Sequence, residues 1–296
     1  MELRVLKYFL MVAREENITR AANLLHVTQP TLSRQLMQLE EELGVKLFDR
    51  GNHNITLTDE GMLLRRRAKE IIDLTEKTEE ELSHRDQEIA GTVAIGCGET
   101  KNMSFLSERM IEFREWYPLV RFQIYSATAE EIKERIEKGL LDIGLLLEPV
   151  DISRFEFIRM REKEQWGILV REDWELARRP SASPKDLAKV PLIMAEREIV
   201  QRDLANWFGD LYENLEIVST YNLLLNAANM AKHGVGAVLC FNMESGYSGL
   251  RFVPLFPRLE SGAVLVWKKD QTFSAAAKRF IERAKECISG ISEDAG

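Results

Sequence analysis

The stretch from Asn17 to Phe48 constrains the fold more than any other part of the chain. It contains signals for the start, the end and the buried face of one helix. Four leucines recur at spacings of four, three and four residues, which places them on one helical face: Leu32, Leu36, Leu39 and Leu43. Thr28 can cap the first turn, and Gly44 can end the helix. The pattern predicts an amphipathic helix whose leucines are buried.

The opposite face of this helix is polar. At about 100° per residue, Arg34 lies opposite Leu32, and Pro30, Thr31 and Gln38 lie to either side of the arginine. Short hydrogen-bonding side chains around one cation are suited to reading the edges of bases. We therefore predict that this face meets DNA.

A shorter helix precedes it across a tight turn. The segment "RAANLLH" can be capped by Thr19, with Ala21 and Ala22 permitting close approach of another backbone and Leu24 and Leu25 on the buried side. Two helices joined this tightly predict a helix-turn-helix, whose second helix enters the major groove. An ordinary helical hairpin has the same leucine spacing, so the flanking elements must decide between the two.

Both flanking elements favour the DNA-binding interpretation. The segment "DRGNHNITLTDEG" after Phe48 places a turn between two short apolar pieces, as in a small hairpin or wing. Arg50 is its cation and a candidate phosphate contact, with a solvated turn residue as the plain alternative. A long helix then begins after Thr58, with a seven-residue repeat that predicts pairing with a second copy: Leu64, Ala68, Ile71, Thr75, Thr78, Leu82 and Ile89.

Composition sets the broad class of protein. The 296 residues suit two domains, and no apolar run approaches the ~18 residues needed to cross a bilayer. The three cysteines, Cys97, Cys240 and Cys287, are far apart, which excludes a disulfide framework and favours a cytoplasmic protein. The net charge is −8, and residues 1–58 carry seven Lys or Arg and seven Asp or Glu, so DNA affinity must depend on a few well-placed cations that a dimer doubles.

From Thr92 short apolar strands alternate with helices, which predicts an α/β fold. The first unit comprises "TVAIG", a helix at 102–116, "VRFQIYSA", a helix at 128–138 and "LLDIGLLLE"; a second unit follows, and "GAVLVWKK" and a helix at 273–288 return to the first. We predict lobe I at about 91–161 and 266–296, and lobe II at about 162–265. The chain then divides into a DNA-binding domain at 1–58, a linker helix and hinge at 59–90, and a two-lobed domain at 91–296.

Two lobes joined by two crossovers leave a cleft, where the carboxyl ends of strands collect ligand-binding residues. In lobe I, Thr100 after the first strand and Ser126 and Thr128 after the second offer hydroxyl groups next to helix starts. In lobe II, Met194, Asn222 and Phe241 follow or end strands and could line the opposite wall. Plain strand-to-helix loops and a simple N-cap at Thr128 are the alternatives.

Motifs for catalysis and metal binding are missing. The sequence lacks a G-x-S-x-G elbow, a P-loop and H-E-x-x-H, and its four histidines are scattered. We expect neither enzymatic activity, nor a cofactor, nor a metal. Cys97 and Cys240 fall at predicted strand ends near the cleft, which leaves a redox-responsive regulator as one alternative. A solute-binding or enzymatic α/β protein with an N-terminal dimerisation module is the other.

The run "ITRAANLLHVTQPTLSRQLMQLEEELGVKLFDR" and the following "ITLTDEG" resemble the LysR-type transcriptional regulators, and the resemblance extends over the whole chain. It implies a winged helix-turn-helix, a dimerising linker helix and a two-lobed effector domain like the periplasmic binding proteins, usually assembled as a homotetramer. It also implies that bases are approached by Gln29, Pro30, Thr31, Ser33 and Arg34. The effector would lie between Thr100, Ser126, Thr128 and the second lobe.

Two positions depart from the family. The wing carries Asn52-His53-Asn54 where relatives often have basic residues, which weakens the case for phosphate contacts there. Glu99 stands beside the hydroxyl positions of the pocket, where an acid repels a carboxylate effector, so a neutral or cationic effector or an outward-turned side chain is implied.

Together these patterns predict a cytoplasmic regulator that binds promoter DNA and itself, as a dimer or tetramer, with RNA polymerase as a further partner. A small molecule in the cleft would change its DNA contacts.

Overall fold

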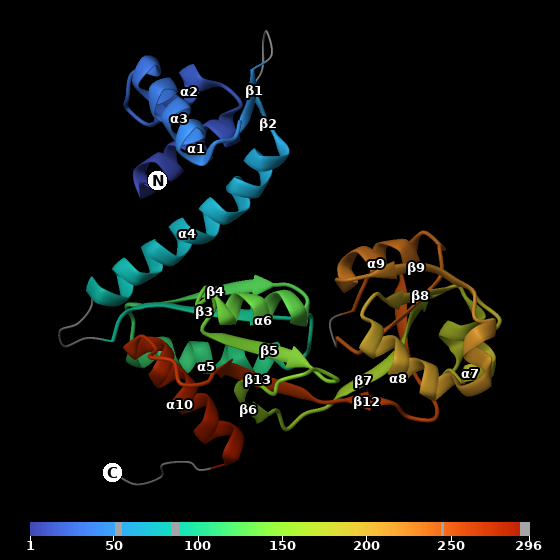
Figure 1. Cartoon of the computed structure of the whole chain (residues 1–296). Coiled ribbons are helices and arrows are strands. Elements are labelled where there is room, and N and C mark those ends of the chain that lie inside the picture. The colour runs from blue at the N-terminus through green and yellow to red at the C-terminus, as the bar shows by residue number, and fades with distance from the viewer. Residues whose placement is uncertain (51–54, 84–88, 244–245, 291–296) are drawn as a thin grey trace, which may run out of the picture. The chain divides into compact units, whose positions relative to one another are not determined.

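The computed structural model describes residues 1–50, 55–83, 89–243 and 246–290, and the chain divides into two compact units, Met1–Arg85 and Asp86–Gly296 (Figure 1). The first unit is helical with one small hairpin. The second unit contains two mixed sheets covered by helices.

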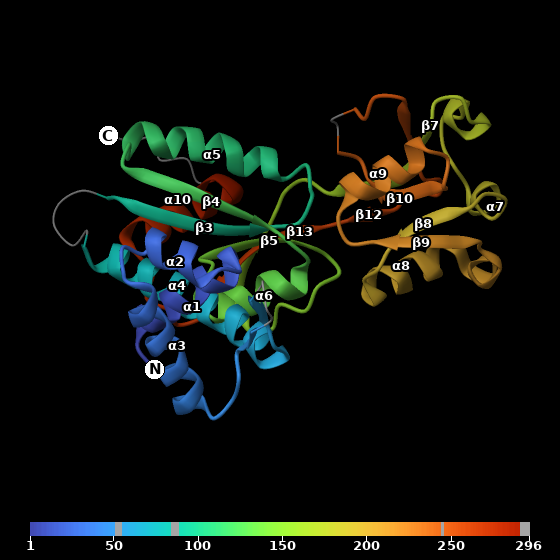
Figure 2. The same cartoon turned by 90° about the horizontal axis from the view of Figure 1, so that it is seen from above.

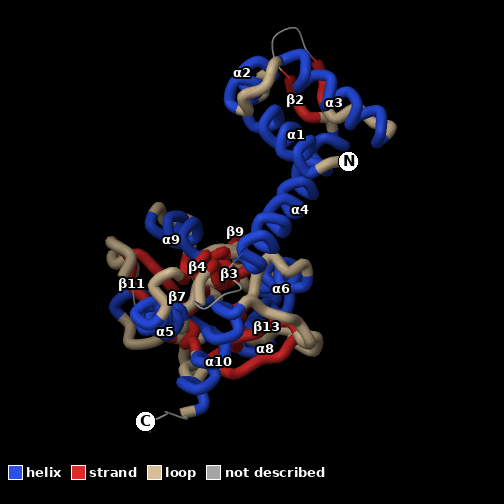
Figure 3. The backbone as a smooth tube through the Cα atoms, turned by 90° about the vertical axis from the view of Figure 1, so that its left-hand side faces the viewer, coloured by secondary structure: helices blue, strands red, loops and turns tan. Residues whose placement is uncertain are grey.

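The first unit gathers three helices and a hairpin at one end of a long helix (Figure 3). Its elements are α1 (Leu3–Glu15), α2 (Ile18–Leu24), α3 (Gln29–Leu43), β1 (Phe48–Arg50), β2 (Ile55–Leu57) and α4 (Asp59–Ser83). Strands β1 and β2 pair antiparallel, with Phe48 opposite Leu57, as the wing prediction requires. The turn of the hairpin at 51–54 and the side chain of Arg50 lie outside the described residues.

Helix α3 follows its predicted pattern closely. Thr28 is the N-cap and its hydroxyl accepts a hydrogen bond from the Thr31 amide, while Gly44 ends the helix at φ 69°. Leu32, Leu36 and Leu39 are buried, whereas Leu43 in the last turn is 40% exposed, so the predicted leucine face is one residue too long.

Helix α2 differs from prediction at both ends. Its N-cap is Asn17, whose Oδ1 accepts the Arg20 amide at 2.9 Å, so the predicted cap Thr19 lies inside the helix. The small Ala21 and Ala22 are buried, but Leu24 is half exposed. At about 100° per residue, Leu24 lies roughly opposite the buried Ala22, on the outer side of the helix.

Helix α4 corrects the predicted dimerisation repeat. Ala68 is fully buried and Leu64 packs against the same core, together with residues of α1 such as Phe9. The prediction of a partner-facing role was wrong for Ala68, because its side chain is buried within its own chain, whereas Leu64 is only partly buried. Ile71 and Leu82 are exposed, as a contact with a second copy requires, and Ile89 belongs to the second unit, outside α4.

A buried carboxylate connects α3 to the hairpin. Glu40 is 3% exposed, and its Oε1 accepts hydrogen bonds from the backbone amides of Leu47 at 2.8 Å and Phe48 at 3.3 Å. Its other oxygen accepts from Lys46 Nζ at 3.2 Å. Burial by itself raises the pKa of the Glu40 carboxyl, but these hydrogen bonds outweigh burial and hold the pKa below 4.5.

The second unit begins with a five-stranded sheet in the order β4-β3-β5-β13-β6. Its elements are β3 (Gly91–Cys97), α5 (Met103–Trp116), β4 (Val120–Ser126), α6 (Ala129–Glu137), β5 (Ile143–Leu147), β6 (Phe155–Arg159), β13 (Ala263–Lys268) and α10 (Ala275–Ser289). Strands β3, β4 and β5 are parallel, as the βαβαβ prediction requires. Helices α5 and α10 share one core with the sheet, and α6 packs in a separate core.

The other sheet has the order β11-β7-β10-β8-β9, with β12 paired to β7. Its strands are β7 (Glu164–Arg171), β8 (Leu192–Ala195), β9 (Ile217–Tyr221), β10 (Ala237–Phe241), β11 (Leu250–Pro254) and β12 (Glu260–Ser261). Its helices are η1 (Glu175–Arg178), α7 (Pro184–Leu187), α8 (Glu198–Phe208), η2 (Gly209–Asn214) and α9 (Leu224–Lys232). Helix α8 contributes to one core beside this sheet and α9 to another.

The chain crosses between the two lobes twice, before β7 and between β12 and β13 (Figure 2). Strand β13 pairs with β5 from Ala263 onward, so the predicted return at 266 lies inside a strand of lobe I. Residue 262 is therefore a better boundary between lobe II and the segment that returns to lobe I.

A buried carboxylate also lies at the first crossover. Glu164 is fully buried at the start of β7, and its Oε1 accepts hydrogen bonds from the Thr100 hydroxyl and from Asn102 Nδ2, the latter at 2.5 Å. Thr100 Oγ1 in turn accepts the Asn102 amide at 3.0 Å. The loop after β3 is thereby fixed to the crossover.

The Glu40 contacts predict an acid-dependent loss of stability. Because the folded-state pKa lies below the unfolded value, Glu40 stabilises the first unit above about pH 4.5 and loses this effect as the pH falls through the folded-state pKa. Glu40→Gln should therefore cost about 1–3 kcal/mol at neutral pH and progressively less in acid. Urea-dependent hydrogen exchange of α1 and α3 peptides measures this unit alone, with the exposed neighbour variant Glu41→Gln as control. A Glu40→Gln penalty that stays constant or grows in acid would contradict the assignment.

The Glu164 contacts predict that Thr100 is structural. Thr100→Val keeps the shape of the side chain but removes a donor to a buried carboxylate, so it should destabilise the second unit by about 1–3 kcal/mol. Hydrogen exchange of β3 and β7 peptides in urea measures this change, with Ser126→Ala at an exposed position as control. Wild-type protection in the Thr100→Val protein would show that the hydrogen bond contributes nothing.

Candidate functional site

The outward face of α3 is the first candidate site. Ser33 is half-buried there, and the other predicted base-facing residues of this helix and its cap are exposed: Thr28, Gln29, Pro30, Thr31, Arg34 and Gln38. Since Leu32 and Leu36 bury the other side of α3, these polar groups point away from the core of the first unit.

Most hydrogen-bonding groups on this face already have local partners. Gln29 Nε2 donates to Ser33 Oγ at 2.9 Å, the hydroxyls of Thr28 and Thr31 lie 2.8 Å apart, and Gln38 Nε2 donates to Glu42 at 3.3 Å. Arg34 is different: within the described part of the chain, its guanidinium makes neither a hydrogen bond nor an ion pair. The exposed face thus presents one unpaired cation among groups that can exchange partners.

An apolar stripe runs along the exposed side of α4 in the same unit. It consists of Leu63, Ile71, Leu74 and Leu82, which follow one another at eight, three and eight residues and lie within about 100° of each other around the helix. Together with the unpaired cation on α3, this stripe gives the first unit two surfaces that lack partners in the monomer.

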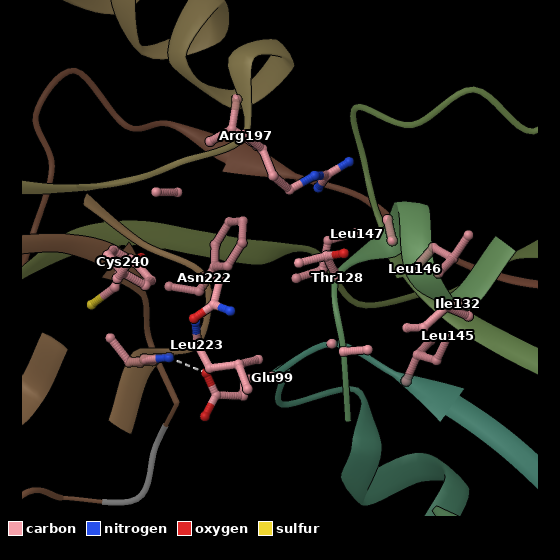
Figure 4. A pocket seen from close by; sticks show the side chains of 18 of the residues that line it. Glu99, Thr128, Ile132, Leu145, Leu146, Leu147, Arg197, Asn222, Leu223 and Cys240 are labelled. Atoms are coloured by element: carbon pink, nitrogen blue, oxygen red, sulfur yellow. Dashed lines mark hydrogen bonds between the residues drawn. The ribbon is translucent and has the colours of Figure 1, made fainter. Parts of the chain in front are cut away.

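The second candidate site is a cavity between the two lobes, with about 750 Å³ of space that is partly open to solvent (Figure 4). Lobe I contributes apolar side chains from the end of β5 and from α6, among them Ile132, Leu145 and Leu146. Lobe II contributes Val200 and Phe241. The polar lining comprises Glu99, Thr128, Glu148, Arg197, Tyr221 and Asn222.

Four of the seven predicted effector residues line this cavity: Glu99, Thr128, Asn222 and Phe241. The other three do not. Thr100 is buried against Glu164, Ser126 is exposed at the end of β4 outside the cavity, and Met194 is fully buried in the core of lobe II. Their positions at strand ends were read correctly, but their side chains point to other faces.

The hydroxyl of Thr128 is also occupied by its own helix. It accepts the amide of Glu131 at 3.4 Å, and the Glu131 carboxylate accepts in return from the Thr128 amide at 3.1 Å, which forms a capping box at the start of α6. The simple N-cap named as an alternative is thus part of what Thr128 does.

Glu99 reaches from lobe I to a backbone amide of lobe II. Its Oε2 accepts a hydrogen bond from the backbone amide of Leu224, the first residue of α9 in the other lobe (Figure 4). The N-terminus of a helix carries a partial positive charge, so this position suits a carboxylate. Glu99 therefore turns into the cleft rather than outward.

Arg197 makes the corresponding contact from lobe II. Its Nη2 donates to the Pro149 carbonyl at 3.2 Å and to Glu130 Oε1 at 3.3 Å, both in lobe I. Glu130 lies in the first turn of α6. The guanidinium at the rim of the cavity is therefore already neutralised by an ion pair with the opposite lobe.

Sequence reasoning missed Arg197, Glu148, Trp166 and the leucines of β5. Leu145, Leu146 and Leu147 could have been found, since they close the third parallel strand and ligands collect at that edge. Arg197 lies two residues after β8, in the strand-to-helix loop that corresponds to the one carrying Glu99 in lobe I. No pattern in the sequence signals Trp166, which reaches the cavity because it lies near the start of β7, next to the first crossover between the lobes.

The two cysteines near the cleft are poorly suited to redox chemistry. Burial, together with the nearby charges of Glu164 and Glu99, raises the pKa of the Cys97 thiol to about 12. Burial and Glu99 also raise the pKa of Cys240 to about 12. Thiols rather than thiolates stand at both positions at neutral pH, and only the thiolate is a good nucleophile.

In the part of the chain that the structure describes, no group of three or more His, Cys, Asp and Glu residues is placed to hold a metal ion. The same residues include no helix long and apolar enough to cross a membrane.

Comparisons with known proteins find matches to both units of the chain. The family model "Bacterial regulatory helix-turn-helix protein, lysR family" matches residues 3–62, and the model "LysR substrate binding domain" matches residues 86–287. The chain is 28% identical over 293 residues to the uncharacterized HTH-type transcriptional regulator YvbU of Bacillus subtilis, covering 97% of this chain and 98% of that protein. It is 30% identical over 209 residues to the HTH-type transcriptional activator IlvY of Salmonella typhimurium, covering 70% and 71%.

Among solved structures, full-length CbnR complexed with its target DNA superposes with a TM-score of 0.75 at 20% identity, covering 97% of this chain and 99% of that one. This likeness shows a shared fold. With both domain models matched in order, the chain belongs to the LysR family of transcriptional regulators, with an N-terminal helix-turn-helix and a C-terminal effector-binding domain.

Proposed function

We propose that this regulator places the first two turns of α3 in the major groove of promoter DNA, with Arg34 reading a base edge. The unpaired guanidinium of Arg34 carries the proposal, because it is exposed among Gln29, Ser33 and Gln38, which can exchange their local hydrogen bonds for bonds to bases. Arg50 would contact phosphate.

Pairing of two copies along α4 completes the DNA-binding unit. The stripe of Leu63, Ile71, Leu74 and Leu82 leaves apolar surface exposed in the monomer, and a second α4 can bury it. A dimer also doubles the few cations of each first unit, which offsets its lack of net positive charge. Further assembly of dimers into a tetramer, action in the cytoplasm and contact with RNA polymerase belong to the same proposal.

The interlobe cavity would hold a small-molecule effector that controls DNA binding or bending. Contacts from both lobes meet there, through Glu99 and Arg197, so a ligand in the cavity can favour one arrangement of the lobes over another. Its differential affinity for those arrangements sets how far it can shift the regulator.

Arg34→Ala tests the base contact. Duplexes that bind the full chain are first selected from random DNA, and affinities for a selected duplex and for a scrambled one are then compared in the same salt. Loss of a bidentate base contact should cost about 1–3 kcal/mol on the selected duplex and much less on the scrambled one. Arg4→Ala, an exposed cation on α1, is the control. Equal losses on both duplexes would assign Arg34 to phosphate, and no enrichment of any sequence would contradict the proposed function.

Leu74→Glu tests the dimer. A carboxylate in the middle of the apolar stripe should shift the full chain towards monomer at micromolar concentration, because the charge would be desolvated on pairing. Sedimentation velocity measures the shift. The same change at an exposed leucine of α2, Leu24→Glu, is the matched control. If Leu74→Glu leaves the oligomeric state as it is in the wild type, the stripe is not the contact between copies.

A further inference from the structure

The interlobe cavity is charged asymmetrically. Two carboxylates line it, Glu99 and Glu148, against one guanidinium, that of Arg197. Arg197 is bound to Glu130 and to the Pro149 carbonyl, and only 17% of its side chain is exposed. A ligand that enters the cavity therefore meets more unbalanced negative than positive charge.

Glu99 is the less neutralised of the two carboxylates. Glu148 Oε1 lies 3.4 Å from Arg159 Nε, whereas Glu99 forms no ion pair with any residue that the structure describes. Its compensation comes from the Leu224 amide at the start of α9, which supplies a dipole rather than a full charge. The Glu99 charge adds to burial in raising the pKa of Tyr221 and of Cys240.

The cavity that Glu99 lines also has aromatic and aliphatic walls. Trp166 and Phe241 both line the cavity, and their ring centroids lie 4.2 Å apart. Ile132, Leu145 and Leu146 form the opposite wall (Figure 4). A carboxylate beside aromatic faces is a combination that binds ammonium groups, and the aliphatic wall offers burial to an apolar body.

We propose that the effector is an organic cation, an inference that rests on the proposed effector control. The effector would be an amine on an apolar body, and its ammonium group would lie against Glu99 and the face of the Phe241 ring. A carboxylate effector would instead face Glu99 at the N-terminus of α9, and that position is already taken by the chain's own carboxylate. At the N-terminus of α6, which also lines the cavity, the Glu131 carboxylate likewise already accepts the Thr128 amide. The ammonium group then competes with the Leu224 amide for Glu99, so effector binding directly alters this contact between the two lobes.

A matched series of small molecules tests the assignment. The probes are 2-phenylethylamine, 2-phenylethanol and phenylacetate, which share an apolar body and differ in charge. Isothermal titration of the full chain should give the amine at least about tenfold tighter binding than either of the others, which is about 1.4 kcal/mol. Carboxylate binding that equals or exceeds amine binding, or no binding of any of the three, would overturn the proposal.

Two variants locate the effect. Glu99→Gln keeps an oxygen that can accept the Leu224 amide but removes the charge, so it should abolish the tenfold preference for the amine. Glu108→Gln makes the same change on α5, where 66% of the side chain is exposed and outside the cavity, and should keep the preference. An unchanged preference in Glu99→Gln would overturn the assignment.

Selected duplex DNA is titrated into the same protein preparations. If DNA binding persists while the amine preference fails, only the effector assignment is lost. If sequence-dependent DNA binding is absent from the wild type, the proposed function itself has failed.

Discussion

Burial of Leu32, Leu36 and Leu39 is the interaction on which the DNA-binding account depends, because it fixes the rotation of α3 about its own axis. Once these three side chains pack into the core shared with α1, Arg34 has no inward alternative. The buried Glu40 then ties the far end of α3 to the backbone of Leu47 and Phe48, so the hairpin follows the orientation of the helix. The packing of these leucines therefore sets the positions of α3 and of the hairpin, the two elements that we propose to contact DNA.

The site in the effector-binding domain is built differently from the DNA-binding face. Residues of two lobes line it, and polar contacts join those lobes. Glu99 reaches from lobe I to α9, and Arg197 reaches from lobe II to Glu130 and the Pro149 carbonyl. The crossover between them is fixed by Glu164 with Thr100. Ligand binding can therefore change the polar contacts across the cleft while the crossover held by Glu164 and Thr100 stays in place.

Local signals were enough to predict α3, its cap and the alternation of strands and helices, since each depends on residues a few positions apart. The dimerisation repeat failed at Ala68 because α1, some fifty residues earlier, covers that side of α4. Met194 was placed at the right strand end but on the wrong face, because burial on both sides of a central strand leaves no alternation to read. Arg197 was missed because its partners lie in the other lobe, a relation that only tertiary structure contains.

Hydroxyl-radical footprinting of the full chain on a selected duplex tests the central claim most directly, because it shows where on the DNA a pair of α3 helices lies. The account predicts two regions of protected backbone, one beside each major-groove half-site, related by two-fold symmetry and with half-site centres separated by about 10–10.5 base pairs or a multiple of that spacing. Protection of a single unpaired site, or uniform weak protection along the duplex, would contradict it.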